Sequence, residues 1–165
     1  MTIRHPAFVV PAAYDALSNS EKSGNISNYL IPTNYSWQTQ LYNFYVANGI
    51  TPVVAEAEDY MSSPEFVRHL ASEAGLDAST CLFEWDAMSE DDQAAQHPMY
   101  VKLQQTLINS TGLVPGKVKG APVLEDEERK WREKFGVEGA VSIKEMVEWA
   151  MPDYEYLRDR KLRLP

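Results

Sequence analysis

The chain has 165 residues, a net charge of −9 and a single cysteine. This length suits one domain, expected to span residues 1–165, and one cysteine excludes an internal disulfide. The acidic balance argues against nucleic acid and anionic membrane surfaces as partners, because both are bound through clustered Lys and Arg. No apolar run approaches the roughly 20 residues that span a bilayer, and residues 1–6 do not resemble a signal peptide. We therefore expect a soluble, cytoplasmic protein.

The first third of the sequence predicts two helices separated by a loop. Pro6 precedes a helix over residues 7–17, and the Ser-, Asn- and Gly-rich residues 18–36 are typical of a loop or lid. A second helix is expected over residues 37–48, with Ser36 as its N-cap. Its apolar positions follow one helical face and are more typical of core than of a pocket: Trp37, Leu41, Phe44 and Tyr45.

A short buried strand is expected next, over residues 51–57, with acidic residues at its end. Ser63 then caps a helix that Pro64 begins and Gly75 ends. A single parallel strand cannot satisfy its own backbone hydrogen bonds. Residues 2–4 could supply part of a second strand. Otherwise strands lie within the loops, the strand pairs with another chain, or the protein is a helical remodelling of an α/β ancestor.

The second half predicts mainly helices, interrupted by a Gly- and Pro-rich loop over residues 111–123. The expected helices cover residues 97–109 and 124–135, a segment opened by a Ser142/Glu145 capping box, and a last segment that Pro152 starts. The predicted fold class is therefore mostly α with a small residual parallel β element.

Four segments, in this order and spacing, resemble one known family. They are Arg4-His5-Pro6 between strand and helix, the strand of residues 51–57 with the Pro64 helix, Ser110-Thr111-Gly112, and residues 130–136. Together they are similar to the C-terminal portion of P-loop sulfotransferase-like proteins, in particular fungal members of unassigned activity. The resemblance implies a truncated α/β remnant with a place in secondary metabolism.

The sequence also departs from this family at the positions that bind the sulfuryl donor. The family's phosphate loop precedes the Arg-x-Pro segment, but only three residues precede Arg4, and no Gly-Lys-Ser/Thr pattern occurs elsewhere. Ala12 stands where the family has a serine that contacts the donor's 3′-phosphate. The Lys117–Gly120 segment reproduces the family's Arg-Lys-Gly run only in part. The expectation is a protein that lacks the P-loop half, uses no cofactor and is not a self-sufficient sulfotransferase.

Three ionisable residues are candidate catalytic groups: His5, Glu56 and Glu58. His5 follows the first expected strand segment, and Glu56 and Glu58 share one face at the end of the next strand. Open α/β sheets place their sites at the carboxyl ends of strands. A histidine next to carboxylates can perform acid–base chemistry near neutral pH. The alternative is a structural ion pair between Arg4 and Glu58 or Asp59. Three scattered histidines without ligand spacing predict no metal site.

The candidate substrate-binding residues are Arg4, Tyr29, Tyr35, Trp37 and Tyr42. The aromatic members would line a pocket for a hydrophobic small molecule. Core packing is the alternative for Trp37, and surface exposure is the alternative for Tyr29 and Tyr35.

Three functions are compatible with these observations. The first is a cofactor-independent enzyme of the cyclase, isomerase or dehydratase type, which encloses a hydrophobic metabolite and assists by acid–base chemistry. The second is a non-catalytic interaction or assembly protein derived from the sulfotransferase-like fold. The third is a fragment of a sulfotransferase. The first two share the expectation of a homodimer.

Overall fold

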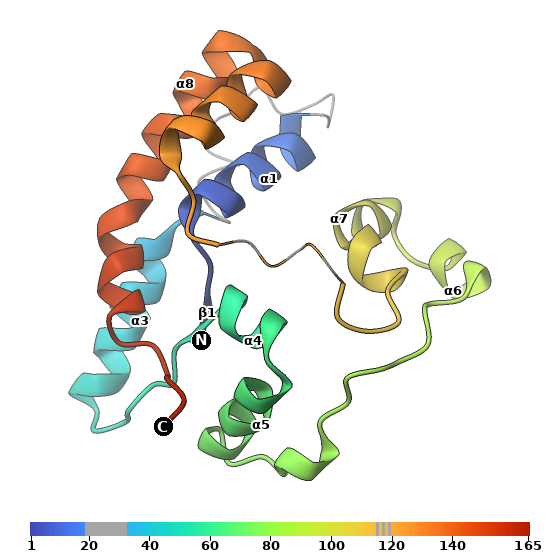
Figure 1. Cartoon of the computed structure of the whole chain (residues 1–165), viewed down its shortest axis with the longest axis vertical. Helices are drawn as coiled ribbons and strands as arrows, with labels where there is room; N and C mark the ends of the chain where they lie inside the picture. Colours follow the sequence, from blue (N-terminus) through green and yellow to red (C-terminus); the bar gives the residue numbers. More distant parts are fainter. Residues whose placement is uncertain (19–32, 115, 117, 119) are drawn as a thin grey trace. The chain divides into compact units, whose positions relative to one another are not determined.

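The computed structural model shows a mostly helical chain with one two-stranded parallel sheet (Figure 1), which confirms the predicted fold class. It describes residues 1–18, 33–114, 116, 118 and 120–165, apart from the side chains of Leu17, Ser18, Met99 and Leu103. The chain forms two compact units, the first comprising Met1–Asp59 with Lys119–Pro165 and the second Tyr60–Val118. The single domain of residues 1–165 stays a prediction.

The sheet consists of β1 (Thr2–Ile3) and β2 (Ala55–Glu56), with Thr2 opposite Ala55 and Ile3 opposite Glu56. Both predicted strands are present but shorter than expected. Groups near both ends of the chain donate hydrogen bonds to backbone carbonyls just before β2. The amino terminus donates to the Val53 carbonyl at 2.6 Å, and the Leu162 N–H donates to the Val54 carbonyl at 2.8 Å. The expected strand is therefore paired within the chain itself.

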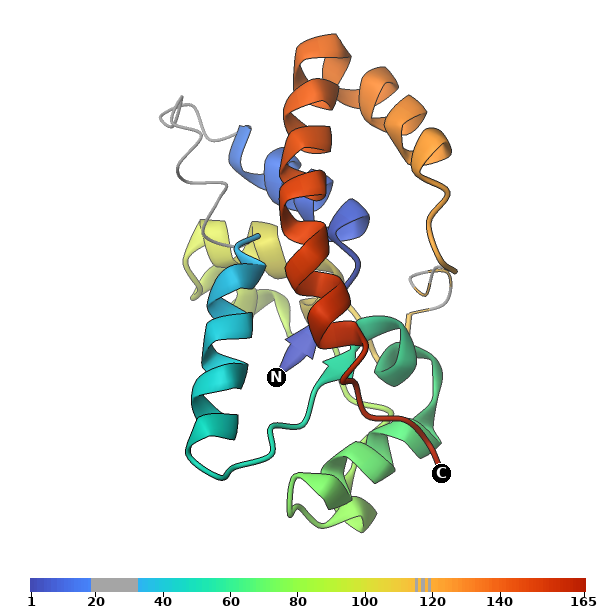
Figure 2. The same ribbon diagram turned by 90° about the vertical axis from the view of Figure 1, so that its left-hand side faces the viewer.

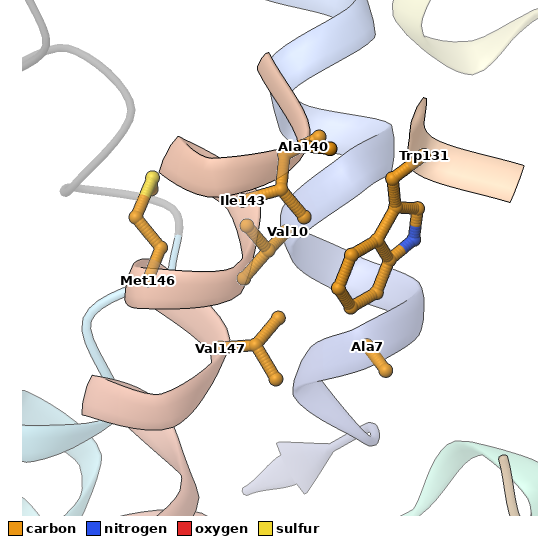
Figure 3. Close-up of a cluster of buried hydrophobic side chains, with 7 residues drawn as sticks. All are labelled: Ala7, Val10, Trp131, Ala140, Ile143, Met146 and Val147. Atoms are coloured by element: carbon orange, nitrogen blue, oxygen red, sulfur yellow. The ribbon is translucent and has the colours of Figure 1, made fainter. Parts of the chain in front are cut away.

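Two helices build the core of the first unit: α1 (Pro6–Ser18) and α8 (Leu124–Arg158). Gly136 has φ 73° and ψ −178° and divides α8 into an N-terminal arm (residues 124–135) and a C-terminal arm (residues 137–158). The two arms, orange and red in Figure 2, meet at a sharp bend. Helix α1 lies between them (Figure 3). The buried cluster at this contact contains Ala7, Val10, Trp131, Ala140, Ile143, Met146 and Val147.

The predicted division of α8 at Ser142 and Pro152 is wrong. Ser142 lies inside the C-terminal arm, where its Oγ donates to the Glu138 carbonyl at 3.1 Å, and the arm continues through Pro152. The reason is a buried stripe that extends on both sides of the proline, from Ile143 to Leu157. Burial of this stripe outweighs the backbone hydrogen bond that a proline removes.

Helix α3 (Tyr35–Ala47) also differs from expectation. Its N-cap is Asn34 rather than Ser36, and the Asn34 Oδ1 accepts from the Ser36 N–H at 3.1 Å. The face predicted to be core points outward, with Trp37 56% and Phe44 61% exposed. Instead, the helix contacts α8 through Tyr42, whose ring packs against Tyr156.

Helix α4 (Ala57–Ser62) follows β2 and leads into the second unit, which contains α5 (Pro64–Glu73), a short 3-10 helix (Ala78–Thr80), α6 (Glu90–Ala94) and α7 (Pro98–Ile108). The α5 start is as predicted, because the Ser63 Oγ accepts from the Phe66 N–H at 3.1 Å. The described residues between 111 and 123 contain no helix. In the predicted loop of residues 18–36, residues 19–32 lie outside the described ranges, whereas Tyr35 and Ser36 belong to α3.

We expect Gly136→Ala to lower the free energy of unfolding by about 1–3 kcal/mol, because the backbone angles of Gly136 lie in a region that only glycine adopts readily. Gly120→Ala is the matched control, since Gly120 has no positive φ and open space around its Cβ position. Urea unfolding followed by circular dichroism measures both variants. Equal stability of the two would contradict a structural requirement for glycine at the bend of α8.

Candidate functional site at the strand ends

A cavity of about 350 Å³ lies at the carboxyl ends of β1 and β2, within the first unit. Four parts of the chain line it: the start of α1 (His5, Phe8), the end of β2 with the start of α4 (Glu56, Glu58), the loop of residues 120–122, and the end of α8 with the tail (Tyr154, Arg158, Asp159, Lys161, Arg163). Parallel strands that end together bring their following residues to one edge of the sheet. The three candidate catalytic residues, His5, Glu56 and Glu58, therefore line one cavity.

Glu56 is almost fully buried, and both of its oxygens are hydrogen-bonded. Its Oε1 accepts from the Tyr154 hydroxyl, and its Oε2 accepts from the Lys161 ammonium at 2.6 Å. Burial alone would raise the pKa of Glu56, but these hydrogen bonds and the charges of Lys161 and Arg158 outweigh burial and lower it below 4.5. Glu56 is thus an anion near neutral pH, and its geometry suits a positioning role.

The surrounding groups complete a paired network. Lys161 also contacts the Asp59 Oδ2 at 2.7 Å. Burial would lower the pKa of Lys161, but its bonds to Asp59 and Glu56 raise it overall. Burial and the bond to Glu56 raise the pKa of Tyr154. Near neutral pH, Tyr154 and Lys161 therefore keep their protons and hold Glu56 in place.

Arg4 and Glu58 form the ion pair that was the structural alternative for these residues. The Arg4 Nε donates to the Glu58 Oε1 at 2.9 Å, and the Arg4 guanidinium lies 5.5 Å from the ring centre of Phe8. Glu58 belongs to α4 rather than to the strand. A carboxylate held in this way on the cavity wall has a defined orientation toward anything bound there.

His5 caps the first turn of α1. Its Nδ1 accepts from the Ala7 N–H at 3.1 Å, which places the proton of the neutral ring on Nε2. Burial lowers the pKa of His5 below 6.5, although the nearby charge of Glu56 acts in the opposite direction. At neutral pH, His5 is therefore an uncharged imidazole with one N–H to donate.

The predicted aromatic residues take other positions. Tyr35 is buried, and its hydroxyl donates to the Arg4 carbonyl; burial raises the pKa of this hydroxyl. Trp37 is exposed, and Tyr42 packs on Tyr156. None of these three side chains is part of the cavity lining, and Tyr29 lies outside the described residues. Substrate binding by these aromatic residues stays a prediction.

Most of the cavity lining was missed from the sequence, including Tyr154 and Lys161, the two residues that hold Glu56. The basic residues 158–163 suit the negative end of a helix dipole and give no sign of a contact with β2. One signal was available. Glu56, Glu58 and Asp59 follow a buried strand and need cations, and the tail carries one of the few dense groups of cations in the chain.

The second unit contains a larger hollow of about 900 Å³, lined by residues 83–86 and 109–114. It includes none of the candidate catalytic residues. Among the described residues, no group of three or more His, Cys, Asp or Glu side chains could hold a metal ion. Within the same ranges, no helix is long and apolar enough to cross a membrane.

Two parallel strands, a helix that starts directly after the first, and a charged cavity at their ends define a reduced α/β protein. Comparisons with known proteins place it more closely. The chain is 32% identical over 175 residues to sulfotransferase ppzF of Metarhizium majus and 31% identical to sulfotransferase ppzF of Metarhizium rileyi. Each match covers 98% of this chain and 52% of the relative. The chain is thus similar to these sulfotransferases over nearly its whole length, and it spans about half the length of these curated relatives.

The other two comparisons add no further relatives. No family model matches the chain. No solved structure matches it either.

The acid sensitivity of the fold should depend on Glu56. Its pKa is lower in the folded protein than in the unfolded chain, so its stabilising effect is complete above about pH 4.5 and disappears as the pH falls through the folded pKa. Between about pH 6 and pH 3, Glu56→Gln should lose less unfolding free energy than the wild type. Glu148→Gln, at an exposed position of α8, should follow the wild type. If the free energy of unfolding, measured with urea, fell equally with pH in all three proteins, the result would contradict this network.

The pKa of His5 can be measured by NMR titration of its ring protons, assigned with the His5→Gln variant. We expect a pKa below 6.5. In Glu56→Gln the pKa should fall further, because the substitution removes the negative charge that favours the imidazolium. If the pKa of His5 rose in Glu56→Gln, the carboxylate of Glu56 would not be close enough to His5 to favour its imidazolium form, which would contradict the described site.

Proposed function

We propose that the chain is a small-molecule enzyme that transfers a proton without a cofactor, as in an isomerisation, a cyclisation or a dehydration. The observation that carries the proposal is the neutral imidazole of His5 beside the oriented carboxylate of Glu58 in one cavity. A neutral N–H donor and a carboxylate are the two groups that removal of a proton next to a carbonyl requires.

The geometry supports a different role for each residue. Glu58 takes a proton from carbon, and the electron pair of the broken C–H bond moves to the neighbouring carbonyl oxygen. His5 donates its Nε2–H to this oxygen and stabilises the enolate without becoming charged. Return of the proton from Glu58 to another carbon yields an isomer; departure of a hydroxyl group with a proton yields water and an alkene. Glu56, Tyr154 and Lys161 keep the site in position.

The lining also favours a substrate class. Its carboxylates, Glu56, Glu58 and Asp159, are matched by three cations, Arg158, Lys161 and Arg163. A balanced lining suits an uncharged carbonyl compound whose negative charge develops only during the reaction. Phe8 and Pro122 provide an apolar contact, and a volume of about 350 Å³ is at the small end of ligand sites.

The test uses the purified full chain and a metabolite extract from a Metarhizium culture, with and without the sulfuryl donor nucleotide, followed by mass spectrometry. We expect a compound to be converted, without nucleotide, into a product of equal mass or a product lighter by one water. Glu58→Gln should lower the rate by about 100-fold or more. His5→Gln, which keeps an N–H donor, should lower it less.

A matched pair of variants tests whether the cavity is the site of this reaction. Ala121→Trp places a large side chain in the cavity lining and should abolish conversion, whereas Ala95→Trp, on an exposed part of the second unit, should not. Conversion that survives Ala121→Trp and Glu58→Gln would contradict the proposal.

A second candidate function is that the chain forms part of a sulfotransferase, which its similarity to half of the Metarhizium sulfotransferases favours. In the same experiment, this function predicts a product heavier by one SO₃ group, formed only with the donor nucleotide and a polypeptide that supplies the donor site. Conversion without nucleotide distinguishes the first candidate from this one.

A third candidate is a non-catalytic interaction or assembly protein, which the exposed apolar side of α3 favours. It predicts self-association or partner binding, with no conversion of the extract in the presence or absence of nucleotide.

A further inference from the structure

The side chain of His5 occupies the N-cap position of α1. The helix begins at Pro6, and the His5 carbonyl accepts from the Phe8 N–H at 2.9 Å. The His5 Nδ1 accepts from the Ala7 N–H at 3.1 Å. Because Pro6 has no N–H, the Ala7 N–H is the first donor of the helix that needs an acceptor. The imidazole of His5 supplies this acceptor.

Two other helices of the chain are capped with the same geometry. The Asn34 Oδ1 accepts from the Ser36 N–H at 3.1 Å at the start of α3. The Asp77 Oδ1 accepts from the Ser79 N–H at 2.9 Å at the start of the 3-10 helix. In each case, as in His5, an atom bonded to Cγ accepts from the residue two positions later. The oxygens of Asn and Asp remain acceptors between about pH 5 and pH 8, whereas an imidazole accepts only while it is neutral.

Protonation of His5 removes this cap. Both nitrogens of an imidazolium are donors, so rotation of the ring does not restore an acceptor. Ala7 is fully buried, so water cannot easily replace the lost acceptor, and a buried N–H without a partner is costly. A positive charge beside the N-terminus of a helix is also unfavourable. The charged form of His5 and the intact first turn of α1 therefore destabilise each other.

The surroundings of His5 act on its charge in both directions. Its ring packs against Phe8 and Tyr154, with ring centres 5.9 and 5.0 Å away, and this burial disfavours the imidazolium. The carboxylates favour it, although Glu56 is bound to Lys161 and Glu58 to Arg4. The titratable and charged groups of other elements around His5 are Glu56 of β2, Glu58 of α4, Tyr154, Glu155 and Arg158 of α8, and Lys161 of the tail.

We propose that His5 is a pH-dependent helix cap: the neutral imidazole holds the first turn of α1 in place, and the imidazolium releases it. Because His5 and Phe8 also line the cavity, release of this turn loosens one wall of the cavity. The cap goes beyond the proposed enzyme function, since it requires neither substrate nor catalysis.

The pH range of this effect follows from the pKa of His5, which burial makes lower in the folded protein than in the unfolded chain. The stabilising effect of the neutral ring is therefore complete above about pH 6.5 and is lost as the pH falls through the folded pKa. The effect of Glu56 begins at lower pH, below about pH 4.5.

Amide hydrogen exchange followed by NMR tests the cap without any substrate, so its result is independent of the proposed enzyme function. The rates are compared one pH unit above and one pH unit below the measured pKa of His5, each corrected for intrinsic exchange. We expect the protection of the Ala7 amide to fall about fivefold or more at the lower pH. The Ser36 amide, capped by Asn34, is the internal control and should keep its protection. An equal change at both amides would overturn the proposal.

A matched pair of variants separates the cap from other effects of acid. His5→Asn keeps an acceptor on Cγ but does not titrate, so Ala7 should be equally protected at both pH values. In urea unfolding, this variant should lose less unfolding free energy than the wild type between the two pH values. His69→Asn removes a histidine from inside α5 and should follow the wild type. Equal losses in His5→Asn and the wild type would overturn the proposal. If His5→Asn does not fold, the comparison of Ala7 with Ser36 in the wild type decides.

Discussion

The packing of α1 between the two arms of α8 is the contact on which the rest of the first unit depends. Trp131 contacts α1 from one arm, and Ile143 and Val147 contact it from the other (Figure 3). Both contacts require the bend at Gly136. His5 directly precedes α1, and Tyr154 and Arg158 lie near the end of the C-terminal arm. Because all three line the cavity, this packing also sets the distance between two of the cavity walls.

Ion pairs of Lys161 attach the C-terminal tail to the end of β2 and to α4. Lys161 joins the C-terminal tail to Glu56 at the end of β2 and to Asp59 in α4, beside the backbone bond from Leu162 to Val54. Buried pairs of this kind add little net stability but leave an expensive unpaired charge when one partner is removed. Their effect is therefore to specify one arrangement of the tail, and the tail closes one side of the cavity.

Capping residues, prolines at helix starts and short apolar runs correctly predicted several helix starts and both strands. The Ser63-Pro64 start of α5, the Pro6 start of α1 and the two strands are examples. The meeting of His5, Glu56 and Glu58 was also predictable, because parallel strands end at a common edge. The continuity of α8 through Pro152 and the contact of Lys161 with Glu56 were not predictable locally. Both depend on segments about 100 residues or more apart in the sequence, as the Lys161–Glu56 separation of 105 shows.

The charges of the cavity bear on which chemistry it favours. A nucleotide sulfuryl donor carries several negative charges and needs a surplus of cations or oriented N–H groups around it. The described lining instead has as many carboxylates as cations, with Glu56 bound to Lys161 and Glu58 bound to Arg4, and its histidine is neutral. A proton transfer within an uncharged substrate creates one transient negative charge, which a single neutral N–H donor can stabilise. This balance of charges favours the proposed proton transfer over binding of a donor nucleotide, even though the chain is similar to the Metarhizium sulfotransferases over nearly its whole length.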